Sequence, residues 1–110
     1  MNDLMRPALY KAHHKIININ LGDQKNKAKW DIVGPVCESS DCFARDILLS
    51  VKQHDLIGIM GAGAYGHVMA SNYNSRPRPP EVLVDGKNFY LIRKRESISD
   101  IVNHEIIHEN

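Results

Sequence analysis

Two strand-like segments joined by an Asp-Gly dipeptide constrain the fold of this chain more than any other feature of its sequence. The segments cover residues 81–84 and 88–93, and Asp85-Gly86 lies between them. Asp-Gly supplies the positive φ angles that the tight turn of a β-hairpin requires. The sequence therefore predicts an antiparallel hairpin near the end of the chain.

Three earlier segments also have the pattern of β-strands. Residues 15–21 alternate between apolar side chains and asparagines, which is the period of a half-buried strand. Residues 30–36 form a second strand that Gly34-Pro35 stops. Residues 55–60 form a buried strand that runs into a glycine-rich segment. Together with the hairpin, these strands predict a mainly antiparallel sheet.

Helices are predicted at both ends of the chain. Apolar residues recur at helical spacing in residues 1–14, where Pro7 is tolerated in a first turn. Ser97 is a typical N-cap for a last helix whose apolar face spans residues 98–106. A weaker pattern at residues 43–48 predicts one helical turn. The predicted fold class is mainly β (α+β), with a short helix at each end.

Composition excludes several classes of function. The 110 residues are enough for one domain, residues 1–110, with a modest core. A net charge of +1 does not suit a nucleic-acid binder with a basic stripe. Cys37 and Cys42 form neither a disulfide framework nor a Cys-x-x-Cys metal site, so we expect a reducing, cytoplasmic setting. No apolar run approaches ~18 residues and no leader is apparent, so we expect neither a membrane segment nor export.

Residues 61–66 match the dinucleotide-binding pattern Gly-x-Gly-x-x-Gly after a predicted strand. Asp85 even lies at about the downstream distance, roughly 20 residues, of the ribose-binding acid. However, that fold needs a helix after the last glycine to hold the pyrophosphate. Here a proline-rich segment follows soon after, and the hairpin turn already explains Asp85. We therefore do not expect a dinucleotide fold.

The last residues contain the zinc-protease pattern His-Glu-x-x-His. On a helix, His104 and His108 share a face and could bind zinc while Glu105 activates water. A catalytic zinc site needs a third protein ligand, which in the usual families comes from further along the chain, and this sequence ends at Asn110. A zinc hydrolase therefore remains only an alternative function, and no metal site is part of the main prediction.

The loop Gly-Pro-Val-Cys-Glu-Ser-Ser-Asp at residues 34–41 holds the most reactive combination of side chains. Its thiol, Cys37, stands beside the carboxylate of Glu38. A cysteine in such a setting can be an acid, a nucleophile or a ligand, whereas the alternative is an exposed polar turn with an incidental cysteine. Asp41 is expected to shape the loop, and Cys42 to be structural or incidental. Chemistry alone leaves the two readings of the loop open.

Several motifs follow one another in an order that is specific as a set. They are Met-Asn-Asp-Leu-Met-Arg-Pro-Ala-Leu-Tyr at residues 1–10, the cysteine loop at 34–41, Gly-Ala-Tyr at 63–65, Asn-Ser-Arg at 74–76 before Glu-Val-Leu-Val at 81–84, and Arg-Lys-Arg-Glu-Ser at 93–97. This order resembles the C-terminal part of the diaminopimelate decarboxylases, fold-type III enzymes that use pyridoxal 5'-phosphate. The resemblance spans essentially the whole chain.

The resemblance implies a β-barrel-like antiparallel sheet domain. Family members join this domain to a (β/α)8 barrel that carries the cofactor lysine, and they work as homodimers with shared active sites. The chain resembles the sheet domain only and lacks the family's (β/α)8 barrel. We therefore expect a fragment that is inactive alone. A non-catalytic module that associates with itself is the alternative.

The resemblance also implies roles for individual residues. Cys37 resembles the general acid that returns a proton to the α-carbon, and a thiol of pKa ~8.5 can do so near neutral pH. Glu38 resembles a carboxylate that contacts the distal end of the substrate, and both residues enter the partner subunit's site. Arg6 and Tyr10 resemble substrate-binding residues, and helical spacing puts them on one face. Tyr65 resembles a residue that touches cofactor and substrate.

The substrate implied by the resemblance is diaminopimelate, which would be converted to lysine and carbon dioxide. Ornithine-type relatives carry Cys-Asp rather than Cys-Glu in this loop. Arg6 offers a positive charge to a distal carboxylate and would repel the cationic end of ornithine.

Overall fold

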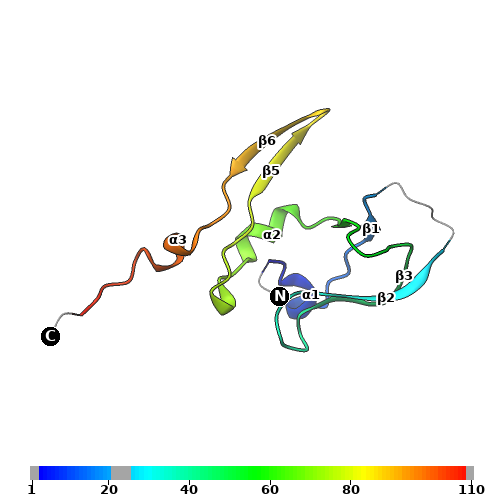
Figure 1. Cartoon of the computed structure of the whole chain (residues 1–110), viewed down its shortest axis with the longest axis horizontal. Coiled ribbons are helices and arrows are strands. Elements are labelled where there is room, and N and C mark those ends of the chain that lie inside the picture. The colour runs from blue at the N-terminus through cyan, green and yellow to red at the C-terminus, as the bar shows by residue number, and fades with distance from the viewer. Residues whose placement is uncertain (1–2, 21–25, 109–110) are drawn as a thin grey trace.

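The structure is a computed structural model that describes residues 3–20 and 26–108 of the chain. Figure 1 shows short strands and helices joined by long connections. In chain order the elements are α1 (Arg6–Tyr10), β1 (Ile16–Asn18), β2 (Ala28–Val33), β3 (Cys42–Leu49), β4 (Ile57–Ile59), α2 (Gly63–Met69), the 3-10 turn η1 (Tyr73–Ser75), β5 (Glu81–Asp85), β6 (Asn88–Arg93) and α3 (Ile98–Val102).

The strands form antiparallel pairs, as the sequence predicts. β1 pairs with β4, β2 with β3, and β5 with β6. A mainly antiparallel fold with few helices is therefore confirmed. The barrel-like closure is not found, because within residues 3–20 and 26–108 each sheet has only two strands. A further helix, α2, lies in the middle of the chain, in addition to those near its ends.

The predicted hairpin is confirmed residue by residue. β5 and β6 pair with Asp85 opposite Asn88, and Gly86 turns the chain with a φ of +59°. The strands expected at residues 15–21, 30–36 and 55–60 are present as the shorter elements β1, β2 and β4. Position 21 of the first of these predictions lies outside the described residues.

The helical turn predicted at residues 43–48 is wrong, because this segment belongs to β3. β3 pairs with β2, where Trp30 faces Ile47 and Ile32 faces Ala44. The register shifts between these two pairs, so β3 has one more residue than β2 in this interval. Asp46 there has a φ of +54°. Such a bulge interrupts the two-residue period of a strand, which makes its apolar residues resemble a helix.

Both terminal helices are shorter than predicted. α1 places its proline in the first turn, as expected, and ends at Tyr10, where the C-cap Lys11 has a φ of +54°. Positions 1–2 of the predicted helix lie outside the described residues. Ser97 caps α3 as predicted, in a reciprocal capping box with Asp100. α3 ends at Val102, so Ile106 lies beyond the helix that was expected to contain it.

The interior is small. Among the described residues, Leu4 is the one apolar side chain in the buried class, with 5% of its surface exposed. It lies directly before α1, which packs near β3 (Figure 1). The β5–β6 hairpin projects away from this region, and the segment after α3 extends away from it as well. Among the described residues, the buried side chains of Leu4 and Asp41 thus lie next to α1 and in the cysteine loop.

Candidate functional site

The cysteine loop, residues 34–41, is organised around a buried carboxylate. Only 3% of the surface of Asp41 is exposed. Its Oδ2 accepts the backbone N–H of Val36 at 2.7 Å, and its own carbonyl accepts the N–H of Gly34 at 3.0 Å. Its N–H donates to the carbonyl of Glu38 at 3.1 Å. These contacts close the loop at its base and bear out the expectation that Asp41 shapes it.

The two cysteines have different surroundings. Cys37 is exposed on the loop, where its thiol is accessible to a reacting group. Cys42 is half-buried at the start of β3, and its Sγ lies 3.4 Å from the carbonyl oxygen of Ala44, to which it donates. The position of Cys42 agrees with a structural reading, and the position of Cys37 leaves it available for chemistry.

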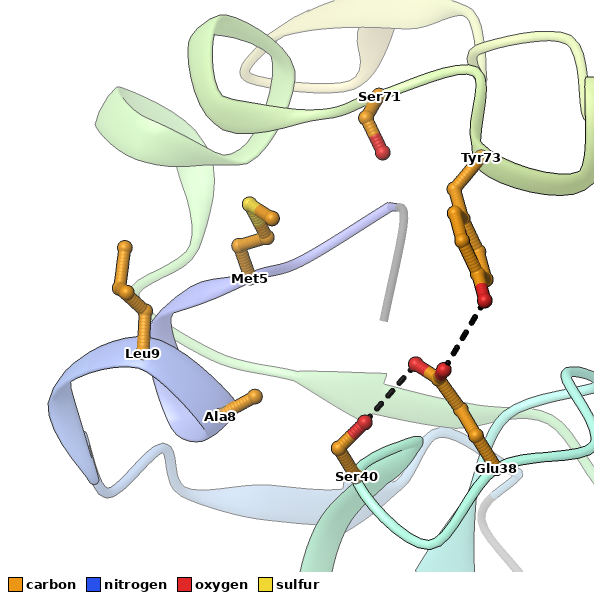
Figure 2. Close-up of a pocket in the computed structure, with 7 residues that line it drawn as sticks. All are labelled: Met5, Ala8, Leu9, Glu38, Ser40, Ser71 and Tyr73. Atoms are coloured by element: carbon orange, nitrogen blue, oxygen red, sulfur yellow. Dashed lines mark hydrogen bonds between the residues drawn. The ribbon is translucent and has the colours of Figure 1, made fainter.

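Glu38 lies between two hydroxyl groups (Figure 2). Ser40 Oγ donates to Glu38 Oε1 at 2.8 Å, and the phenol of Tyr73 donates to Oε2 at 3.2 Å. The negative charge of Glu38, together with this hydrogen bond, raises the pKa of Tyr73 above its ordinary value. The phenol therefore stays protonated and able to donate at neutral pH.

A cavity of about 350 Å³ opens beside this carboxylate, and we name it the Glu38 pocket. One wall is apolar and comes from α1 and the residue before it, whereas the opposite wall is polar (Figure 2). Its lining residues are Met5, Ala8, Leu9, Glu38, Ser40, Ser71 and Tyr73. The pocket thus joins a short apolar surface to a negative charge.

A second cavity of about 260 Å³ lies on another face of α1, and we name it the Arg6 pocket. It is lined by Arg6 and Tyr10 from α1 and by Tyr65 and Met69 from α2. The guanidinium carbon of Arg6 lies 5.2 Å from the centre of the Tyr65 ring, which is the range of a cation–π contact. The structure therefore brings together three of the five residues singled out from the sequence.

Cys37 and Glu38 do not line the Arg6 pocket of their own chain. Residues of α1 at helical spacing form a wall of each pocket, so the helix stands between the two sites. Ser40 and Tyr73 both contact Glu38; Ser40 belongs to the cysteine loop that the sequence singled out, whereas Tyr73 was not singled out. The contact of Tyr73 with Glu38 becomes visible only in three dimensions.

Neither the glycine-rich motif nor the His-Glu-x-x-His motif, both within the described residues, has the geometry that its expected function requires. α2 begins at Gly63, inside the glycine-rich segment, so no helix starts after its last glycine as a dinucleotide fold requires. The His-Glu-x-x-His segment follows the end of α3, and residues 105–108 have no helical structure, so the helical face expected to hold zinc is not formed. Over residues 3–20 and 26–108 no group of three or more His, Cys, Asp or Glu side chains is placed to hold a metal ion.

Within residues 3–20 and 26–108, the helices offer no candidate for a bilayer span. In the part of the chain that the structure describes, none is both long enough and apolar enough to cross a membrane.

Residues 1–63 match the family model described as "Pyridoxal-dependent decarboxylase, C-terminal sheet domain". The diaminopimelate decarboxylase of Haemophilus influenzae is 50% identical over 101 residues, which cover 92% of this chain and 24% of that protein. The corresponding protein of Zymomonas mobilis is 54% identical over 106 residues, covering 96% of this chain and 25% of that protein.

Solved structures agree with this result. A crystal structure of diaminopimelate decarboxylase from M. jannaschii has a TM-score of 0.89 and 46% identity, covering 98% of this chain and 25% of that one. The Helicobacter pylori protein, crystallised with L-lysine, has a TM-score of 0.84 and 44% identity, covering 94% of this chain and 25% of that one. The chain thus spans about a quarter of the length of the relatives that it matches.

Proposed function

Because the chain belongs to the pyridoxal-dependent decarboxylases, through their C-terminal sheet domain, we propose that it serves diaminopimelate decarboxylation. In this proposal it forms the sheet-domain part of a cytoplasmic carboxy-lyase that converts meso-diaminopimelate to L-lysine and carbon dioxide. The observation that carries the proposal is the meeting of Arg6, Tyr10 and Tyr65 in one pocket. Diaminopimelate decarboxylases are also the relatives that align with nearly the whole chain.

The Arg6 pocket has the chemistry of an anion site. A guanidinium binds a carboxylate through two parallel hydrogen bonds, and phenol groups can donate to the same ligand. Arg6 in this proposal binds the distal carboxylate of the substrate, and Tyr10 lies on the same helix face beside it. Tyr65 holds the guanidinium through its ring, which leaves its hydroxyl available to the cofactor and the substrate.

The residues that line the Arg6 pocket suit a pyridoxal-phosphate enzyme because they include Tyr65, but they do not supply the lysine that holds the cofactor. Tyr65 would contact the cofactor, which acts as the electron sink for the carbanion formed when carbon dioxide leaves. The lining residues of the Arg6 pocket, all within the described ranges, include no lysine. We therefore propose that the cofactor lysine comes from a (β/α)8 barrel and that these 110 residues alone do not catalyse the reaction.

Cys37 is proposed as the acid that returns a proton to the α-carbon. Its thiol is exposed, and the buried Asp41 carboxylate closes the loop that presents it. A thiol donates a proton near neutral pH far more readily than a serine hydroxyl, so residue type matters at this position. Glu38, next in the chain, brings a negative charge that suits the distal ammonium of the substrate.

The separation of the two pockets supports a homodimer with shared active sites. Arg6 and Tyr10 line the Arg6 pocket on one face of α1, whereas Glu38 lines the Glu38 pocket together with residues of another face. The residues that line the Arg6 pocket of this chain include neither Cys37 nor Glu38, which supports a donor from a second subunit. In the proposed dimer, Cys37 and Glu38 of one subunit complete the Arg6 pocket of the other.

The proposal can be tested in a chimera that replaces the aligned quarter of the Haemophilus influenzae enzyme with this chain. We expect this parent chimera to release carbon dioxide from meso-diaminopimelate when supplied with pyridoxal phosphate. Cys37→Ala should lower kcat by at least about 100-fold, the usual contribution of a general acid. Cys42→Ala is the matched control and should leave kcat close to that of the parent chimera.

Two results would count against the proposal. Equal kcat values for Cys37→Ala and the parent chimera would remove Cys37 from the chemistry. A correctly folded parent chimera without activity on diaminopimelate would instead favour the non-catalytic, self-associating module.

A further inference from the structure

We propose that Tyr73 and Ser40 are positioning residues that orient the Glu38 carboxylate for the distal ammonium group of the substrate. The identity of that ammonium group rests on the proposed function. The arrangement of the three side chains does not, because it follows from the contacts in this chain.

The two hydroxyl groups engage opposite oxygens of the carboxylate. Ser40 donates to Oε1 and Tyr73 donates to Oε2. An ionised carboxylate has about four lone-pair sites, so each oxygen keeps one for a further donor. A glutamate on an exposed loop otherwise loses considerable rotamer freedom when it binds a ligand. The two hydrogen bonds remove part of that freedom before the ligand arrives.

The apolar wall of the Glu38 pocket limits the number of hydrogen-bond donors within reach of the Glu38 carboxylate. Met5, Ala8 and Leu9 face it across the cavity and offer no side-chain donor (Figure 2). A charged carboxylate beside such a surface gains from any donor on the other side. Tyr73 supplies a donor there, and it belongs to a segment 35 residues further along the chain.

Tyr73 itself is fixed by its neighbours. The side-chain amide of Asn72 donates to the carbonyl of Arg76 at 3.0 Å and to Glu96 Oε2 at 2.7 Å. Asn74 adopts a left-handed conformation with a φ of +56°, which tightens the turn right after the tyrosine. Arg78 completes the support, since its Nε donates to Glu96 Oε1 at 2.6 Å. The phenol therefore projects from a braced turn toward Glu38.

A titration of the chain itself tests the contact independently of any activity. The probe is the ring carbon that bears the hydroxyl in 13C-labelled tyrosine, followed by NMR. Glu38→Gln removes the negative charge, so the pKa of Tyr73 should fall toward its ordinary value of 10.0. Glu105→Gln, which removes an exposed carboxylate beyond α3, is the matched control and should leave the pKa of Tyr73 unchanged. An unchanged pKa of Tyr73 would overturn the proposal.

Kinetics of the parent chimera test the positioning role. Tyr73→Phe and Ser40→Ala each remove one hydroxyl and should raise KM for meso-diaminopimelate by about 2- to 12-fold, the range for one hydrogen bond. Because the contact is made to substrate and transition state alike, kcat should change much less. Tyr90→Phe removes a hydroxyl outside the pocket and should leave both constants unchanged.

These experiments distinguish a failure of the positioning role from a failure of the proposed function. An active parent chimera whose Tyr73→Phe and Ser40→Ala variants keep the parent KM would overturn the positioning role and leave the proposed function intact. A loss of kcat without a rise in KM would also overturn it, because it would indicate a role in the chemical step. An inactive parent chimera would overturn the proposed function, and the tyrosine titration would still decide whether Glu38 and Tyr73 interact.

Discussion

Glu96 joins the turn that carries Tyr73 to the segment that follows β6. Its carboxylate accepts hydrogen bonds from the side chain and the backbone of Arg78 and from the amide of Asn72. The hydrogen bond from the Arg78 side chain is the main reason that the pKa of Glu96 falls from 4.5 to about 2, with the backbone N–H of Arg78 and the Asn72 amide adding to it. The charged form of Glu96 is therefore part of the folded structure.

This shift predicts a pH-dependent contribution to stability. Because the folded pKa lies below the ordinary value, Glu96 stabilises the fold above pH 4.5, and this contribution is lost as the pH falls toward about 2. Glu96→Gln should thus lower the free energy of unfolding at neutral pH, and the difference from the parent chain should disappear near pH 2. Urea unfolding followed by circular dichroism measures both values.

Glu105→Gln is the matched control for this experiment, because Glu105 is an exposed carboxylate beyond α3. It should leave the free energy of unfolding nearly unchanged across the same pH range. A deficit of Glu96→Gln that is equally large at neutral pH and at pH 2 would contradict the assignment of the pKa shift to folding.

Individual site residues were predictable to different degrees. The motifs singled out Arg6, Tyr10 and Tyr65, and the four-residue spacing on a helix predicted that the first two would lie together. Their roles in binding substrate and cofactor stay predictions. Tyr73 was not predictable, because its contact with Glu38 joins distant parts of the chain and depends on the left-handed turn after it. Local sequence patterns contain no information about such a contact.

At the scale of elements, Gly34 determines whether the cysteine loop can close. A Cβ atom at this position would lie 2.3 Å from the carboxylate oxygens of Asp41. Real side chains do not approach so closely, and that carboxylate is buried and holds the N–H of Val36. The position directly after β2 therefore has to be a glycine for the loop to wrap around Asp41.

Gly34→Ala should destabilise the chain by about 1–3 kcal/mol, the usual cost of overpacking. The matched control is Gly66→Ala in α2, where no atom lies within 4 Å of the added methyl group. There alanine should stabilise by roughly 0.5–1 kcal/mol, because it favours the helix. Denaturant unfolding of both variants gives the comparison, and equal stability of the two would refute the steric argument.

Elements with strong local sequence signals were predicted correctly, whereas features without such a signal were missed. The β5–β6 hairpin and the Ser97 cap were correct because turn and cap residues act over a few neighbours. β3 was missed because its bulge depends on the partner strand β2. The end of α3 was also missed, since the apolar residues beyond Val102 continue the helical spacing although the helix does not.

At the scale of the whole molecule, the chain is more extended than a compact domain. Its radius of gyration is 16.9 Å, and its principal extents are 65 × 37 × 26 Å. A compact domain of this length has a radius of about 13 Å. Large apolar side chains are exposed on the hairpin, with Val84 at 69% and Phe89 at 77%. The composition gives the fraction of apolar residues, but it does not determine how few of their side chains are buried.

This exposed apolar surface predicts that the chain associates with itself in solution. Val84 and Phe89 face each other across the hairpin, so replacing them by Thr and Gln should shift the sedimentation coefficient toward that of a 12.5 kDa monomer. Val68→Thr, which changes a 74% exposed residue in α2, is the control and should leave sedimentation unchanged. A parent chain that sediments as a monomer at every concentration would contradict this prediction.

The position of α1 between the Arg6 pocket and the Glu38 pocket limits how this protein can evolve. One residue inserted between Pro7 and Ala8 would rotate the rest of the helix by about 100°, since a turn contains 3.6 residues. Tyr10 would then move away from Arg6, and Leu9 would move out of the Glu38 pocket. Both pockets thus depend on the same turn of helix, so this stretch tolerates exchanges of side chains far better than changes of length.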